Sequence, residues 1–339
     1  MSHPDRLALA VASRALDVPA SGAILVLRAA PSAFLDLVPR DRLHCVQGFR
    51  PLHDSLAAVG LAVTAAVPED FPSPAMAVVN LTRSRAENLG NVAAALGALL
   101  PDGTLVVTGA KGDGIDSLAR QLARAIPLEG TFVKAHGRVV WLTRPAALPR
   151  DVAAWAAAAE PRRNPEGFLT APGMFSPDHA DPGSRRLAAV VGGRLSGRVA
   201  DLGAGWGWLA QAVLAASPAI AELDLHEAEA IALDAARANV SDPRARFHWS
   251  DVARLGGTAP YDAVIANPPF HQDRAAQPEL GVAFIAAAAR ILKPAGQLFL
   301  VANRQLPYEA ALDAAFRDGE KLGEDAAYKV LRAARPRRT

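Results

Sequence analysis

The sequence predicts an α/β protein with two consecutive, mostly parallel sheets. Short apolar runs alternate with longer segments of helical periodicity, as expected for buried strands joined by helices. With 339 residues, half of them apolar, the chain is long enough for two domains with large cores. The same succession of strand, helix, Pro-x-Gly turn and strand occurs once in each half.

Four strands are expected in the second half, and each ends near a polar side chain. They cover residues 199–202, 221–227, 246–251 and 261–266. Asp201 lies in the first strand and Glu227 ends the second. Asp251 ends the third, and Asn267 follows the fourth. Because ligands of such sheets bind at the carboxyl ends of the strands, we expect these side chains to border a cleft.

A glycine-rich turn follows the first of these strands and leads into a helix. It contains Gly203, Ala204, Gly205 and Gly207. Glycines let the backbone approach a ligand closely, and the amino end of the helix offers free N–H groups. Trp208 stands where the dinucleotide-binding pattern Gly-x-Gly-x-x-Gly has its third glycine, so that pattern is absent.

The fourth strand is followed by Asn267, Pro268, Pro269 and Phe270. The side-chain oxygen of Asn267 and the carbonyl of Pro268 can each accept a hydrogen bond from a planar amine. Two prolines in succession fix φ and remove two backbone donors, so the turn presents acceptors rigidly. Phe270 supplies a ring on which a base can stack. The segment therefore suits the binding of an exocyclic amine for attack on an electrophile.

In this order on consecutive strands, the glycine loop, the two acids and Asn-Pro-Pro-Phe resemble the class I S-adenosylmethionine-dependent methyltransferases. The resemblance implies S-adenosylmethionine as cofactor and a Rossmann-like sheet of seven mostly parallel strands. It implies that Asp201 and the loop of Gly203, Ala204, Gly205 and Gly207 hold the amino acid part of the cofactor. It further implies that Glu227 binds the ribose and Asp251 the adenine amino group, with Asn267 at the cofactor and Asn267 to Phe270 holding the target nitrogen.

Two further segments narrow the resemblance. Gly173-Met-Phe-Ser176 followed by Asp181-Pro-Gly-Ser184, and the later run at residues 301–308, are similar to the bacterial 16S ribosomal RNA guanine-N2 methyltransferases of the RsmC family. This similarity implies methylation of the N2 amine of a guanine in small-subunit RNA. The chain departs from the family pattern at Pro182 and at the loop tryptophans, Trp206 and Trp208, which either pack under the loop or crowd it.

The first half repeats the pattern without its chemistry. Asn80 follows a strand as Asn267 does, but Leu81 and Thr82 replace the two prolines, and residues 28–31 contain no glycine. We therefore expect a degenerate methyltransferase-like domain at 1–148, which docks RNA or stabilises the rest. A linker with a short helix at 149–168 and a catalytic domain at 169–339 follow.

Composition excludes several classes of protein. The single cysteine, Cys45, rules out internal disulfides and cysteine-rich metal sites. The histidines lack metal-ligand spacing, so no metal is expected. The first residues have no signal-peptide core, and the apolar runs are too short to span a bilayer. We expect a cytoplasmic monomer whose partner is ribosomal RNA or the small ribosomal subunit.

The sequence motif also allows other activities. The same motif serves enzymes that methylate guanine N2 of 23S RNA, adenine N6 of nucleic acids and the glutamine N5 of proteins. A different class of function is a catalytically dead RNA-binding scaffold, against which the intact glycine loop and Asn-Pro-Pro-Phe argue.

Overall fold

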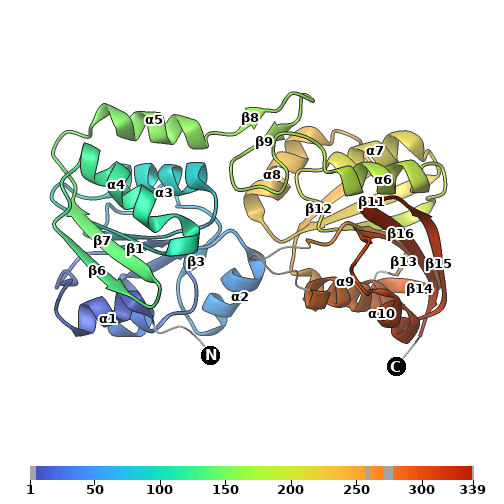
Figure 1. Cartoon of the computed structure of the whole chain (residues 1–339), viewed down its shortest axis with the longest axis horizontal. Coiled ribbons are helices and arrows are strands. Elements are labelled where there is room, and N and C mark those ends of the chain that lie inside the picture. The colour runs from blue at the N-terminus through green and yellow to red at the C-terminus, as the bar shows by residue number, and fades with distance from the viewer. Residues whose placement is uncertain (1–4, 257–259, 270–277, 338–339) are drawn as a thin grey trace. The chain divides into compact units, whose positions relative to one another are not determined.

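The structure is a computed structural model that describes residues 5–256, 260–269 and 278–337. The chain divides into two compact units, Met1–Pro161 and Arg162–Thr339, each with its own seven-stranded sheet (Figure 1). No helix in the described part of the chain is long and apolar enough to cross a membrane.

The first unit alternates strands and helices along the chain. Its strands are β1 (Ile24–Leu27), β2 (Leu43–Val46), β3 (Val63–Thr64), β4 (Met76–Asn80), β5 (Thr104–Ala110), β6 (Gly130–Lys134) and β7 (Gly137–Thr143). Its α-helices are α1 (Arg6–Ala12), α2 (Arg50–Ala58), α3 (Arg85–Ala98), α4 (Ile115–Ala125) and α5 (Arg150–Ala159).

The second unit begins with a two-stranded ribbon of β8 (Arg162–Arg163) and β9 (Leu169–Thr170). Its main sheet contains β10 (Gly197–Leu202), β11 (Ile220–Glu227), β12 (Ala245–Trp249), β13 (Tyr261–Ala266), β14 (Leu292–Asn303), β15 (Phe316–Glu324) and β16 (Tyr328–Pro336). Its α-helices are α6 (Pro182–Val191), α7 (Trp208–Ala216), α8 (Ala230–Asn239), α9 (Pro278–Ile291) and α10 (Glu309–Ala315).

The two sheets have the same topology. Their orders are β3-β2-β1-β4-β5-β7-β6 and β12-β11-β10-β13-β14-β16-β15. In each sheet the last three strands of the order make antiparallel pairs and the other pairs are parallel. The expected α/β fold of two Rossmann-like, mostly parallel sheets is therefore confirmed.

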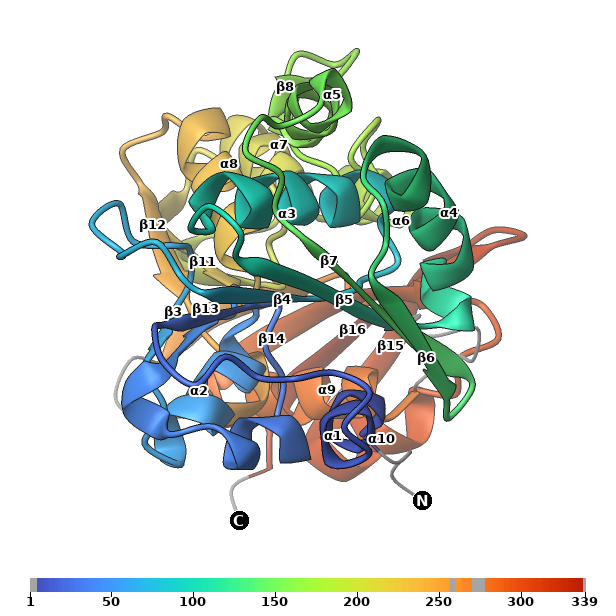
Figure 2. The same cartoon turned by 90° about the vertical axis from the view of Figure 1, so that its left-hand side faces the viewer.

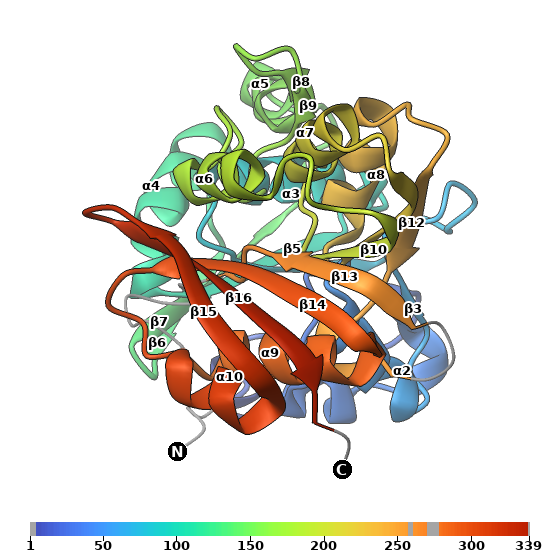
Figure 3. The ribbon, with the colours of Figure 1, turned by 90° about the vertical axis from the view of Figure 1, so that its right-hand side faces the viewer.

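Helices cover both faces of each sheet, which explains why the central strands are apolar on both sides. In the first unit α3 and α4 lie on one face and α1 and α2 on the other (Figure 2). In the second unit α6, α7 and α8 cover one face and α9 and α10 the other (Figure 3). The carboxyl ends of β10, β11 and β13 are thus left as the edge at which polar side chains gather.

Helix α5, within the segment expected to be a linker, packs into the core of the first unit. Val152 and Trp155 are both buried there. Gly90 on α3 allows the close approach, since a Cβ at that position would lie 2.2 Å from the Cβ of Ala159. This packing explains why the first compact unit extends to Pro161.

Candidate active site

The glycine loop and Asn267 extend from neighbouring strands. Leu202, the last residue of β10, pairs with His226 on β11 and Ala266 on β13. The residues that follow each strand are therefore close together at one edge of the sheet.

The loop turns through backbone conformations that favour glycine. Gly205 has a φ of +56° and Gly207 a φ of +91°. A Cβ on Gly207 would lie 2.8 Å from Val240 Cγ2, so the loop needs glycine there to pack on α8. A Cβ on Gly205 would meet no atom within 4 Å, so this position faces open space.

Asp201 is buried without a partner. Its side chain is 1% exposed, and neither carboxyl oxygen accepts a hydrogen bond from any described residue. Burial, together with the neighbouring Glu227, raises the pKa of Asp201 to about 8. A buried carboxyl with no donor is costly, so this group is suited to pairing with a cationic or N–H donor from a ligand.

Glu227 connects the end of β11 to the glycine loop. Its Oε2 accepts a hydrogen bond from the backbone N–H of Gly205 at 2.8 Å, and its Oε1 accepts one from Glu229 at 2.8 Å. Burial raises the pKa of Glu227, and these backbone hydrogen bonds act in the opposite direction. The acid expected to bind the ribose thus also holds the loop.

Asp251 lies further from the loop, after the edge strand β12. It caps the short 3₁₀ turn Val252–Arg254, accepting a hydrogen bond from the N–H of Ala253 at 2.9 Å. It does not line the pocket described next, so its proposed contact with adenine rests on the resemblance alone.

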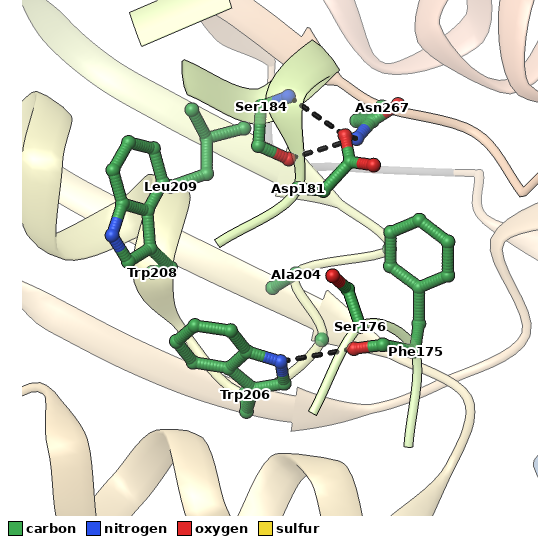
Figure 4. Close-up of a pocket in the computed structure, with 11 residues that line it drawn as sticks. Phe175, Ser176, Asp181, Ser184, Ala204, Trp206, Trp208, Leu209 and Asn267 are labelled. Carbon is green, nitrogen blue, oxygen red and sulfur yellow. Dashed lines mark hydrogen bonds between the residues drawn. The ribbon is translucent and has the colours of Figure 1, made fainter. Parts of the chain in front are cut away.

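An open pocket, whose empty space of about 430 Å³ includes the solvent at its mouth, lies between the loop and Asn267 (Figure 4). It is lined by Phe175, Ser176, Asp181, Ser184, Gly203, Ala204, Gly205, Trp206, Trp208, Leu209 and Asn267. Of the expected site residues, the pocket brings together Gly203, Ala204, Gly205 and Asn267. Asp201, Gly207, Glu227, Asp251, Pro268 and Pro269 do not line it.

Asn267 lies at the pocket with its amide orientation determined by its neighbours. Its Nδ2 donates to Asp181 Oδ2 and to Ser184 Oγ, both at 2.8 Å. A carboxylate can only accept, so the NH₂ group must face Asp181. The Oδ1 atom is buried and accepts no hydrogen bond from the described residues. Phe270, the fourth member of the motif, lies outside the described residues.

The chain is similar to known methyltransferases. Residues 166–332 match the family model described as "Methyltransferase small domain". Ribosomal RNA small subunit methyltransferase C of Klebsiella pneumoniae is 32% identical over 250 residues, which are 69% of this chain and 68% of that protein. The chain belongs to this methyltransferase C family.

Two other members show the extent of the likeness. The enzyme of Pectobacterium atrosepticum is 35% identical over 178 residues. These residues make up 50% of this chain and 49% of that enzyme, so the match spans about half the length of the relative. The structure of the T. thermophilus 16S rRNA N2 methyltransferase (RsmC), in complex with AdoMet and guanosine, superposes with a TM-score of 0.78 at 26% identity. That superposition covers 94% of this chain and 90% of that one.

Trp206, Trp208 and Pro182 depart from the family pattern, and the fold accommodates all three. Trp206 is 5% exposed, packs against Phe168 and donates from Nε1 to the carbonyl of Phe175 at 3.0 Å. It therefore anchors the segment that carries Phe175, and it also lines the pocket. Trp208 borders the pocket, with the Arg185 guanidinium 5.1 Å from its ring centre. Pro182 is the first residue of α6, a position that favours proline.

The first unit fills the corresponding positions with side chains that are already bound to other residues of that unit. Leu27 pairs with Val46 and Val79 as Leu202 pairs with His226 and Ala266, so Arg28, Gln47 and Asn80 match Gly203, Glu227 and Asn267 in register. Arg28 Nε donates to Glu87 at 2.6 Å.

Gln47 takes the position that Glu227 has in the second unit, but it cannot replace that acid. It is 2% exposed, with Nε2 donating to the carbonyl of Ala29 at 2.6 Å and Oε1 accepting from Phe49 at 2.9 Å. An amide with both ends engaged and no charge is a poor partner for ribose hydroxyls.

Sequence reasoning missed the contacts of Asp181 and Ser184 with Asn267. They lie 86 and 83 residues away in the chain. The sequence signal that could have found them is the N-cap pattern of a helix that begins at Asp181. In the structure Asp181 accepts a hydrogen bond from the N–H of Ser184 at 2.9 Å and so caps α6. Among the described residues, no group of three or more potential metal ligands occurs.

Proposed function

We propose that the second unit transfers a methyl group to the exocyclic N2 amine of a guanine in 16S ribosomal RNA, with S-adenosylmethionine as the methyl donor. The observation that carries the proposal is the buried Oδ1 of Asn267, which has no partner among the described residues and lies at a pocket bordered by the glycine loop. The likeness to methyltransferase C proteins over two thirds of the chain supports the choice of substrate.

The residues present fit the cofactor. Asp201 offers two buried oxygens that accept no hydrogen bond within the described part of the chain, and these suit the ammonium of an amino acid. Gly205 leaves open space beside its backbone, and Glu227 stands next to it with a carboxylate for hydroxyl groups. When bound, S-adenosylmethionine supplies a methyl group on a positively charged sulfur.

Asn267 has the central part in the reaction. Its Oδ1 accepts one N–H of the guanine amine, and the carbonyl of Pro268 is expected to accept the other. Two acceptors favour a more tetrahedral nitrogen whose lone pair points at the methyl carbon. As the N–C bond forms and the C–S bond breaks, the amine loses one proton to water. Positioning therefore provides most of the catalysis, and no strong base is needed.

The test is transfer of a labelled methyl group into unmethylated ribosomal RNA and small subunits, followed by nucleoside analysis of separated 16S and 23S RNA. We expect N2-methylguanosine in 16S RNA alone. Label in 23S RNA, in N6-methyladenosine or in protein glutamine would contradict the assignment. The expectations that the enzyme acts as a monomer in the cytoplasm remain proposals, which light scattering and cell fractionation would test.

Cofactor binding at pH 7 should release close to one proton. With a pKa of about 8, the carboxyl of Asp201 is largely protonated in the free protein, and a bound ammonium group favours the carboxylate. Calorimetry in phosphate and in Tris buffer should therefore give different binding enthalpies. Asp201→Asn should bind more weakly and give the same enthalpy in both buffers. Equal enthalpies for the wild type would contradict this assignment of Asp201.

A second measurement tests Asp201 without ligand. Its pKa in the folded state lies above the ordinary aspartate value of 3.8, so between pH 4 and pH 8 the folded protein binds the extra proton. The contribution of Asp201 to the free energy of unfolding is present below pH 4 and is lost as pH rises to 8. The loss is at most about 1.4 kcal/mol per pH unit. Asp201→Asn should flatten this part of the stability profile measured by urea unfolding.

The whole chain should bind one cofactor molecule. We propose that the first unit is a degenerate copy that docks RNA or stabilises the second, because Arg28 and Gln47 already bind neighbouring residues. Calorimetry of the full chain should give one site, and a second site of similar affinity would overturn this interpretation.

A further inference from the structure

The amide of Asn267 is held from one side only. Figure 4 shows Asp181 and Ser184 converging on its nitrogen from the start of α6. Both Nδ2 contacts measure 2.8 Å, so the two N–H groups of the amide have acceptors. The oxygen on the other side has none among the residues that the structure describes.

The first turn of α6 is built around the Asp181 carboxylate. Asp181 Oδ2 caps the helix through the N–H of Ser184 and also accepts from Asn267. Gly183 leaves room for it, since a Cβ at that position would lie 2.9 Å from Asp181 Oδ2 and 3.1 Å from Tyr328 Cε1. Leu187 is buried in the core beneath the helix, so the turn rests on a rigid element.

The first unit has the same helix cap but not the contact. Asp5 begins α1 and accepts from the backbone N–H groups of Leu7 and Ala8, and its second oxygen accepts from Phe34. Asn80, the match of Asn267, donates to the carbonyl of Leu27 at 3.2 Å. Capping the helix therefore does not by itself require the cap residue to bind the asparagine.

We propose that Asp181 and Ser184 are positioning residues that keep the Asn267 oxygen directed at the target amine. An unrestrained amide has two orientations related by a half-turn, and one of them would present N–H donors to the N–H groups of the substrate. Asp181 excludes that orientation because a carboxylate and an amide oxygen repel each other. A negative acceptor on Nδ2 also draws electron density onto Oδ1 and makes it a stronger acceptor. The inference rests on the proposed function.

Two variants separate this role from helix capping. Ser184→Ala removes the hydroxyl and keeps the backbone N–H that Asp181 caps. Asp181→Ser keeps a good N-cap residue but withdraws the carboxylate. Each should lower the single-turnover rate roughly 10- to 100-fold, with unchanged cofactor affinity. Ser184→Thr, which keeps the hydroxyl, should restore most of the rate. Ser84→Ala, which removes the N-cap side chain of α3, is the control and should leave the rate unchanged.

A double-mutant cycle gives the decisive result. If the two residues act through Asn267, Ser184→Ala should have little further effect in a chain that already carries Asn267→Ala. Equal losses in both backgrounds would overturn the proposal. So would losses that appear only as weaker cofactor binding.

A second readout needs no turnover. In ¹H–¹⁵N spectra, the side-chain amide signals that Asn267→Ala removes should exchange slowly with solvent in the wild type and rapidly in Ser184→Ala. Unchanged exchange would overturn the proposal. If exchange accelerates while wild-type protein methylates no guanine in 16S RNA, the proposed function fails and the positioning of Asn267 stands.

Discussion

Replacement of Asn267 by alanine should lower the turnover of methyl transfer by two or more orders of magnitude while cofactor affinity stays near that of the wild type. The Oδ1 atom has no hydrogen-bond partner among the residues that the structure describes, so we expect its hydrogen bond to form with the substrate. The lost interaction aligns the nitrogen in the transition state, and losses of alignment typically cost roughly this much rate. Single-turnover methylation of unmethylated small subunits, with cofactor affinity measured by calorimetry, is the test.

The chain supplies its own control for this experiment. Asn80 holds the matching position in the first unit, and Asn80→Ala removes the same side chain from the end of a parallel strand. We expect this variant to turn over like the wild type. Near wild-type turnover of Asn267→Ala would show instead that the Asn-Pro-Pro-Phe segment is only a structural turn.

Gly205→Arg should abolish cofactor binding and, with it, methyl transfer. The position faces open space at the pocket, so an arginine side chain would occupy the volume that the ligand needs. Its φ of +56° adds only moderate strain, since non-glycine residues occur in that region. Calorimetry should detect no binding at protein concentrations that saturate the wild type.

Gly114→Arg is the matched control. Gly114 also has a positive φ, +84°, and open space around its Cβ position, but it lies before α4 in the first unit. The control should therefore carry a similar backbone cost and keep its cofactor affinity. Loss of affinity in both variants would mean that folding, and not the pocket, had been damaged.

Local patterns explain which parts of the fold were predictable. The strands at 199–202 and 261–266 follow from short apolar runs, and the repeated Pro-x-Gly turns gave the relation between the two halves. The bounds of the closing strands β15 and β16 follow instead from their antiparallel pairing, which continues to Phe316 and Pro336. Strand ends depend on a partner, which periodicity along one segment does not reveal.

The site was predictable to the extent that its residues follow strands. Gly205 and Asn267 lie together at the pocket because β10 and β13 are neighbours. Asp181 and Ser184 were missed because their contact with Asn267 joins distant parts of the chain. The role of Asp251 stays a prediction because its side chain binds the turn that it caps and does not line the pocket. The role of Phe270 stays a prediction because this residue lies outside the described residues.

The hydrogen bonds of the glycine loop affect how fast and how tightly a ligand binds. In the free protein Glu227 holds Gly205, and Asn239 donates to the carbonyl of Trp206 at 2.9 Å. The loop is therefore preorganised, and a ligand loses little affinity to the conformational entropy of ordering it. Association should be limited by diffusion into the pocket, so the rate constant should rise linearly with ligand concentration without reaching a plateau set by loop closure.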